Sequence, residues 1–214
     1  MEKRQLTPLD RLLGSAGNAL RTVAAPAGRA ARANPAEHII DADLDDHQKA
    51  HAAGLMRVNH AGEVCAQALY QGHAAVARDR SVEEQMQRAA DEEFDHLAWC
   101  EQRISELGEN VSKLSPFWYA GSFAIGAVSG ILGDKWSLGF IAETEKQVCA
   151  HLDSHLDSLP PEDLRSRAIV EQMRDEEEEH GESAIQAGAA ELPEPIKRLM
   201  TMTAKIMTKT AYRV

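Results

Sequence analysis

The sequence has few aromatic residues and no alternating β-branched segments. Phe, Trp and Tyr make up 5% of its 214 residues, whereas charged residues make up 27%. Because strands favour alternating patterns of β-branched and aromatic side chains, this composition argues against a β-rich fold. A chain of this length can bury one substantial core and still carry appendages. We therefore expect an all-α protein.

Cysteine is also scarce, with Cys65, Cys100 and Cys149 as the three cases and no Cys-x-x-Cys pair. An odd number leaves one thiol unpaired, and we find no signal peptide, so we expect a reducing cytoplasm. No thiolate cluster favours zinc, and no Ser/His/Asp or Cys/His signature indicates nucleophilic catalysis. The cysteines are expected to pack as small apolar residues.

The charge is unevenly distributed. The net charge is −11, yet residues 1–33 contain six Lys/Arg against two acids, and residues 196–214 contain five Lys/Arg and no acid. An acidic central region disfavours nucleic acid as a partner, whereas basic ends suit an anionic membrane surface. We expect contact with a membrane and none with nucleic acid.

Two Glu-x-x-His motifs stand out, at Glu93–His96 and at Glu177–His180. Residues three apart on a helix share a face, so each motif presents a carboxylate and an imidazole together. Glu63 precedes the first motif by 30 residues, and Glu145 precedes the second by 32. This duplicated order, Glu and then Glu-x-x-His, is the rule for dimetal-carboxylate four-helix bundles. A solvated surface pair explains one motif, but two in register are harder to obtain by chance.

The predicted architecture is a ferritin-like four-helix bundle with a di-iron centre. Glu143 competes with Glu145 for the inward position, since residues two apart face about 200° apart. Apolar Ile141, Val148 and Leu152 flank Glu145 at helical spacing and favour it. The predicted metal ligands are Glu63, Glu93, His96, Glu145, Glu177 and His180. Tyr70, about two turns beyond Glu63, either hydrogen-bonds near the site or simply packs.

The remaining segments are predicted to surround the bundle. Residues 1–35 form a basic amphipathic helix and a mobile linker, and residues 36–214 form the di-iron domain. Residues 114–133 carry no charge and connect the two halves, either buried or as a partly exposed apolar surface that dips into one leaflet. Residues 195–210 form a second basic amphipathic helix, which either packs on the core or meets a membrane.

The predicted ligands determine which chemistry is available. Carboxylates and imidazoles suit Fe(II) or Mn(II), and four Glu charges balance two divalent ions. Six protein ligands leave coordination positions open for O₂. We expect each His to donate its second N–H to a nearby carboxylate, although the sequence does not identify which one.

Several of these segments resemble one protein family. RVNHAGEVCAQALYQG, EFDH, the uncharged glycine-rich middle, ETEKQVCAH and RDEEEEH occur in the order and spacing of the COQ7 family of demethoxyubiquinol hydroxylases. The resemblance covers roughly residues 43–214. It implies a di-iron monooxygenase of ubiquinone biosynthesis that hydroxylates the ring of a polyprenylated demethoxyubiquinol with O₂, using electrons from NADH or the quinol itself.

The resemblance also implies residue roles, partners and a location. It assigns the same six ligands and a supporting role for His151, whereas Leu152 stands where some members have Tyr, so a redox role for that Tyr does not transfer. It implies a membrane-bound enzyme, and together with the basic ends and the reducing cytoplasm inferred above we expect a peripheral position on the cytoplasmic face of the cell membrane. Partners would be the quinol, O₂, the membrane surface, and a second copy or accessory ubiquinone-biosynthesis proteins.

A ferritin-like iron-storage or iron-oxidising protein would use the same six ligands, because fold and ligand set do not fix function. The uncharged middle and the basic ends favour the hydroxylase, since a soluble storage protein has little use for either. A di-iron hydroxylase of tRNA is disfavoured by the acidic central region.

Overall fold

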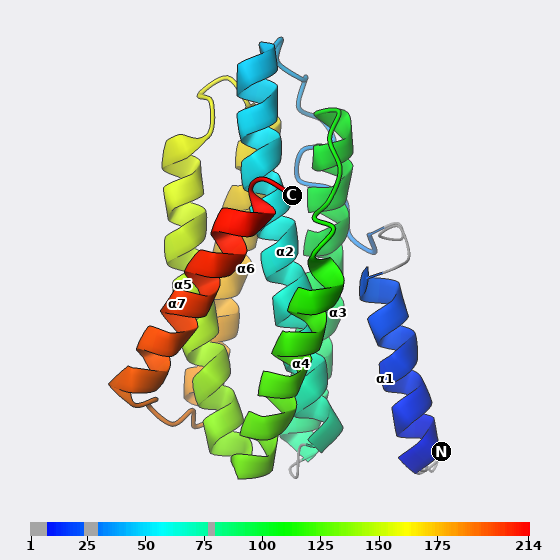
Figure 1. The fold of residues 1–214 in the computed structure, drawn as a ribbon, viewed down its shortest axis with the longest axis vertical. Coiled ribbons are helices and arrows are strands. Elements are labelled where there is room, and N and C mark those ends of the chain that lie inside the picture. The colour runs from blue at the N-terminus through cyan, green and yellow to red at the C-terminus, as the bar shows by residue number, and fades with distance from the viewer. Residues whose placement is uncertain (1–7, 24–29, 77–79) are drawn as a thin grey trace.

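The structure, a computed structural model, describes residues 8–23, 30–76 and 80–214 (Figure 1). These residues form helices and no strand, which confirms the all-α prediction. The helices are α1 (Pro8–Val23), α2 (Asp46–Val76), α3 (Arg80–Glu106), α4 (Ser115–Leu132), α5 (Asp134–Ser158), α6 (Leu164–Gln186) and α7 (Glu194–Ala211).

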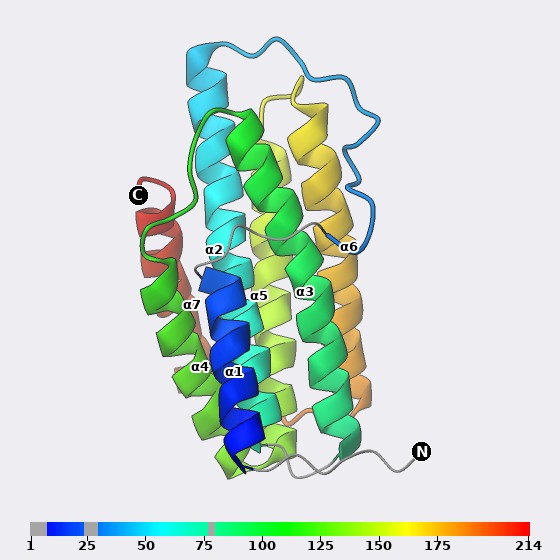
Figure 2. The same ribbon diagram turned by 90° about the vertical axis from the view of Figure 1, so that its right-hand side faces the viewer.

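Helices α2, α3, α5 and α6 form the four-helix bundle, as Figures 1 and 2 show. Within it α2 packs on α3 and α5 packs on α6, and contacts between α2 and α5 and between α3 and α6 join the two pairs. Each pair consists of one helix with a single predicted Glu ligand and one with a Glu-x-x-His motif. The duplicated pattern in the sequence is therefore a duplicated helix pair.

Two apolar layers fill the bundle interior. One layer includes Met56, Trp99, Leu152 and Met173, with neighbours from the same four helices. The other includes Tyr70, Met86, Ile141 and Ala184, again one from each helix. On every helix the predicted ligands lie between these layers in the sequence, so the fold places a polar layer between two apolar ones.

Helix α4 connects the two halves and lies along the outside of α2 (Figure 1). The two backbones approach closely, since a Cβ added to Gly126 would meet Leu69 O, and one added to Gly72 would meet Phe123 O. One side of α4 is buried through Tyr119, Gly126, Ser129 and Gly130.

The other side of α4 is exposed, because Phe117 is 74%, Val128 60% and Leu132 65% accessible. Of the two interpretations of residues 114–133, this arrangement fits the partly exposed apolar surface. In the described part of the chain, no helix is both long and apolar enough to span a bilayer.

The terminal helices cover the bundle from outside. Helix α1 packs on α2 and α4, and α7 packs on α2 and α5. The linker predicted to be mobile spans residues 25–35. Of these, residues 25–29 lie outside the described residues. Its described part is tied to the bundle, since Ala31 N donates to Asp95 Oδ1 at 2.6 Å and Arg32 pairs with Asp95 and Glu176, each at 2.6 Å.

Candidate metal centre

The polar layer brings predicted ligands from three helices together. Glu63 of α2, Glu93 and His96 of α3 and Glu177 of α6 each offer one ligand atom within 4.8 Å of the others, and all four residues are buried. Residues far apart in the sequence thus form one acidic cluster, as the spacing of the motifs predicted.

Glu93 and Glu177 lie between the two imidazoles. His96 Nδ1 is 3.1 Å from Glu93 Oε2 and 3.1 Å from Glu177 Oε1. His180 Nδ1 is 3.3 Å from Glu93 Oε1 and 3.2 Å from Glu177 Oε2. Each of these carboxylates therefore directs one oxygen toward each imidazole, so that each could serve a metal ion on either side.

The other two predicted carboxylates lie on opposite sides of this shared pair. Glu63 Oε2 is 3.8 Å from His96 Nδ1. Glu145 is 1% exposed and accepts a hydrogen bond from Tyr70 Oη at 2.7 Å, and the Tyr70 ring packs edge-on against His180. Glu145 is thus on the His180 side, outside the four-residue cluster. Its neighbour Glu143 is less buried and accepts from Gln147 instead.

The cluster concentrates negative charge in a buried environment. Burial and the charge of Glu93 raise the pKa of Glu63, and burial and the charge of Glu177 raise the pKa of Glu145. Burial would also raise the pKa of Glu93, but hydrogen bonds with His180 and His96 hold it below its ordinary value. These carboxylates need protons or cations around them to be neutralised.

The pKa values of the two imidazoles are raised by the same carboxylates, which favour the protonated ring. Burial alone would lower the pKa of His180, yet its contacts with Glu177 and Glu93 raise it to about 12. The same two carboxylates, with Glu176 and Glu63, raise the pKa of His96 well above its ordinary value. The carboxylates thus favour positive charge at both imidazole positions, and a bound cation would compete with protons there.

Among the predicted ligands, three buried carboxylate oxygens form no hydrogen bond of regular geometry, namely Glu93 Oε1, Glu145 Oε2 and Glu177 Oε1, and the first and last of them have only the imidazole contacts given above. Buried polar atoms in proteins are nearly always satisfied, so such a group of acceptors indicates a missing positive partner. Carboxylate oxygens combined with imidazole nitrogens suit iron or manganese. The residues present therefore fit a metal centre.

A second pair of carboxylates orients the imidazoles. His96 Nε2 lies 2.6 Å from Glu176 Oε2, and His180 Nε2 lies 2.6 Å from Glu92 Oε2. Each acceptor directly precedes the Glu of the opposite motif, so α3 and α6 exchange these contacts. The sequence predicted such acceptors without identifying them, and the repeated pattern Glu-Glu-x-x-His is the signal that could have done so.

His151 lies farther along α5, beside a second histidine. Its ring centroid is 4.1 Å from that of His155, and its buried Nε2 has no hydrogen-bond partner. His155 Nδ1 in turn lies 2.7 Å from Asn59 Oδ1. These contacts link His151 to the α2 and α5 side of the bundle, and its supporting role stays a prediction.

Comparison with known proteins gives consistent matches. The family model described as "Ubiquinone biosynthesis protein COQ7" matches residues 50–211. A protein from Chromobacterium violaceum is 59% identical over 96% of this chain and 100% of its own length. One from Pseudomonas putida strain GB-1 is 55% identical over 99% of both chains, and both are named 3-demethoxyubiquinol 3-hydroxylase. With this match over three quarters of its length and these identities, the chain belongs to the COQ7 family of ubiquinone biosynthesis proteins.

Proposed function

We propose that the protein is a di-iron monooxygenase that hydroxylates the ring of a polyprenylated demethoxyubiquinol with O₂ in ubiquinone biosynthesis. The observation that carries this proposal is the buried pair Glu93 and Glu177, shared between His96 and His180. The names of the relatives supply the substrate class and the reaction. NADH or the quinol would supply the electrons.

The six predicted ligands divide naturally between two iron ions. Glu63 and His96 would hold one ion, Glu145 and His180 the other, and Glu93 and Glu177 would serve both. Two divalent cations offset the four carboxylate charges, and bound iron supplies the redox chemistry that O₂ activation needs.

The surrounding residues fix the positions of these ligands. Glu176 and Glu92 accept from the Nε2–H of His96 and His180, and Tyr70 donates to Glu145. The two apolar layers keep water away from the polar layer, which strengthens each electrostatic contact. The chain thus prepares the geometry before metal or substrate arrives.

Iron storage is the competing function, and the two differ in what iron-loaded protein does with a quinol. A hydroxylase binds about two iron ions per chain, as its class does, and converts a short-chain demethoxyubiquinol in the presence of reductant and O₂. A storage protein accumulates many more iron ions and leaves the quinol unchanged. Iron content by mass spectrometry and product by chromatography distinguish these outcomes, and iron uptake without product would favour storage.

Glu176→Ala is expected to weaken iron binding about 10- to 100-fold, the usual effect of removing an acceptor behind a ligating His. Glu92→Ala should have a smaller effect, because the Glu92 side chain is 49% exposed, whereas that of Glu176 is 15% exposed and also bonds Arg32. Competition with a chelator measures both. The exposed Glu179→Ala on the same helix is the control, and equal affinities for Glu176→Ala and this control would contradict the role.

We further propose that the protein lies peripherally on the cytoplasmic face of the cell membrane. Exposed apolar side chains on α4 and α7 support this position, since the two helices lie on one face of the bundle in Figure 1. Helix α7 adds exposed Arg198, Lys205 and Lys209, which suit anionic lipid headgroups. The exposed members of this apolar set are Phe117, Ile125, Val128, Ile131, Leu132, Leu199, Met202 and Ile206.

Ile131→Glu is expected to lower binding to vesicles with anionic lipids by about tenfold or more, because it puts a charge in place of an apolar side chain whose burial in the bilayer would be worth roughly 1.5–3 kcal/mol. Ile185→Glu is the matched control, since Ile131 is 60% and Ile185 63% exposed, and Ile185 belongs to α6, a helix that lies behind α4 and α7 in Figure 1. Vesicle sedimentation measures the difference. Equal losses in both variants would speak against the α4 and α7 face.

A further inference from the structure

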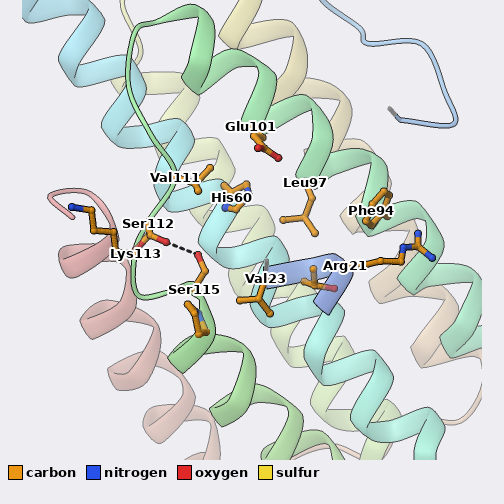
Figure 3. A pocket seen from close by; sticks show the side chains of 12 residues that line it. Arg21, Val23, His60, Phe94, Leu97, Glu101, Val111, Ser112, Lys113 and Ser115 are labelled. Atoms are coloured by element: carbon orange, nitrogen blue, oxygen red, sulfur yellow. Dashed lines mark hydrogen bonds between the residues drawn. The ribbon is translucent and has the colours of Figure 1, made fainter. Parts of the chain in front are cut away.

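A cavity of about 300 Å³ lies outside the bundle interior, enclosed by the last turn of α1, by α2 and α3, and by the segment that leads into α4 (Figure 3). Five of the twelve residues that line it are apolar, and polar or charged residues, among them His60, Arg21, Glu101 and Lys113, form the rest. The wall residues used below are Val23, His60, Phe94, Leu97, Val111 and Pro116.

The cavity adjoins the helices that carry the predicted ligands. His60 lies one turn before Glu63 on α2, and Leu97 directly follows His96 on α3. Because residues three apart on a helix share a face, His60 borders the metal-ligand layer. The cavity therefore lies against two of the helices that carry the predicted ligands.

His60 is the chemically informative group in this wall. It is 5% exposed, and its Nδ1 has no hydrogen-bond partner. Burial lowers the pKa of His60 to about 4, so the ring is neutral at physiological pH and offers one donor and one acceptor. A buried imidazole with an unpaired nitrogen suits a ligand that brings a hydroxyl group, and the apolar part of the wall suits the body of a ring.

The size of the cavity narrows the ligand class. Pockets for small molecules occupy about 300–1,000 Å³, so this one has room for a single substituted ring and not for a dinucleotide. Pro116 stands at the first turn of α4, next to the exposed Phe117. The apolar outer side of α4 therefore begins at the cavity.

We propose that this cavity binds the hydroxylated aromatic ring of the quinol substrate, with His60 hydrogen-bonded to a ring hydroxyl and the isoprenoid tail lying along α4. This inference rests on the proposed function and specifies where its substrate docks. The last turn of α1 forms the outer wall, where the Arg21 guanidinium lies 4.6 Å from the centroid of the Phe94 ring.

Because the cavity residues bind the ring and do not ligate iron, their substitution should act mainly on binding. Val111→Trp fills the cavity and is expected to weaken binding of a one-isoprene demethoxyubiquinone at least tenfold. It should raise KM by a similar factor and change kcat less than threefold. Asn110→Trp is the matched control, since Asn110 is exposed on the same segment and is not part of the wall. Equilibrium dialysis with iron-loaded protein measures the binding.

His60→Phe tests the hydrogen bond while keeping a ring of similar shape. It still tests the cavity assignment if Val111→Trp fails to fold. A loss of one hydrogen bond is expected to weaken binding about 3- to 10-fold. Unchanged binding in both Val111→Trp and His60→Phe, in protein that still hydroxylates the quinol, would overturn the cavity assignment and leave the proposed function intact. Absence of binding and turnover in the unsubstituted protein would instead contradict the proposed function.

Discussion

Glu177→Ala is expected to lower turnover of a demethoxyubiquinol by about three orders of magnitude or more, as loss of a central active-site group does. The reason is geometric, because Glu177 directs one oxygen toward His96 and the other toward His180. Its removal takes a ligand from both predicted iron ions at once. Bound iron, measured by mass spectrometry, should fall with the turnover.

The fold of this variant should survive. Glu177 is one of several buried carboxylates that repel one another without metal, so its loss relieves repulsion while the apolar layers remain. Circular dichroism should report a helical protein. Glu178→Ala is the matched control, since Glu178 is exposed and contacts Arg174. Full activity in Glu177→Ala would show that Glu177 is not a required ligand, and would contradict the assignment of shared ligands.

Gly126→Val is expected to lower the free energy of unfolding by about 3 kcal/mol, near the upper end of the usual cost of overpacking. A Cβ at this position meets the backbone of Leu69, and backbone atoms cannot yield as a flexible side chain does. Helix α4 would have to move away from α2. Urea denaturation measures the loss.

Gly121→Ala on the same helix separates this clash from a general effect of removing glycine. A Cβ at Gly121 meets nothing within 4 Å, and the substitution should stabilise the protein by about 0.4–1 kcal/mol. If Gly126→Val and Gly121→Ala unfolded at the same urea concentration, close backbone packing would not be what holds α4 in place.

The positions of the metal-ligand helices followed from local regularities. A carboxylate and an imidazole three residues apart share a face on any helix, so Glu93 with His96 and Glu177 with His180 needed no tertiary information. Apolar neighbours at helical spacing favoured Glu145 over Glu143, and Glu145 is indeed the buried one. These inferences use only the period of the helix.

Features that depend on how the helices pack against one another could not be predicted from the sequence. The contacts of Glu176 with His96 and of Glu92 with His180 require the mutual register of α3 and α6. The hydrogen bond of Tyr70 to Glu145 likewise crosses from α2 to α5, so packing and hydrogen bonding near the site could not be separated beforehand. The cavity needs α1 folded back on the bundle, and nothing in the amphipathic pattern of α1 specifies where it docks.

The buried side of the apolar connecting segment, residues 114–133, could not be predicted from its hydropathy either. Its lack of charge fitted both a buried helix and an interfacial one, because hydropathy does not say which side of a helix meets protein. In the structure the small residues Gly126, Ser129 and Gly130 face α2, and Phe117 and Val128 face outward. The position of small residues decided the buried side.

Transfer of labelled oxygen is the most direct test of the proposed function. Iron-loaded protein would be incubated with a short-chain demethoxyubiquinol, reductant and ¹⁸O₂, with Glu177→Ala as control. Mass spectrometry would then measure the mass of the quinol. Hydroxylation predicts one ¹⁸O atom in the product of the intact protein and none with the variant. An unlabelled quinol after the bound iron has been oxidised by O₂ would contradict the hydroxylase and favour iron storage.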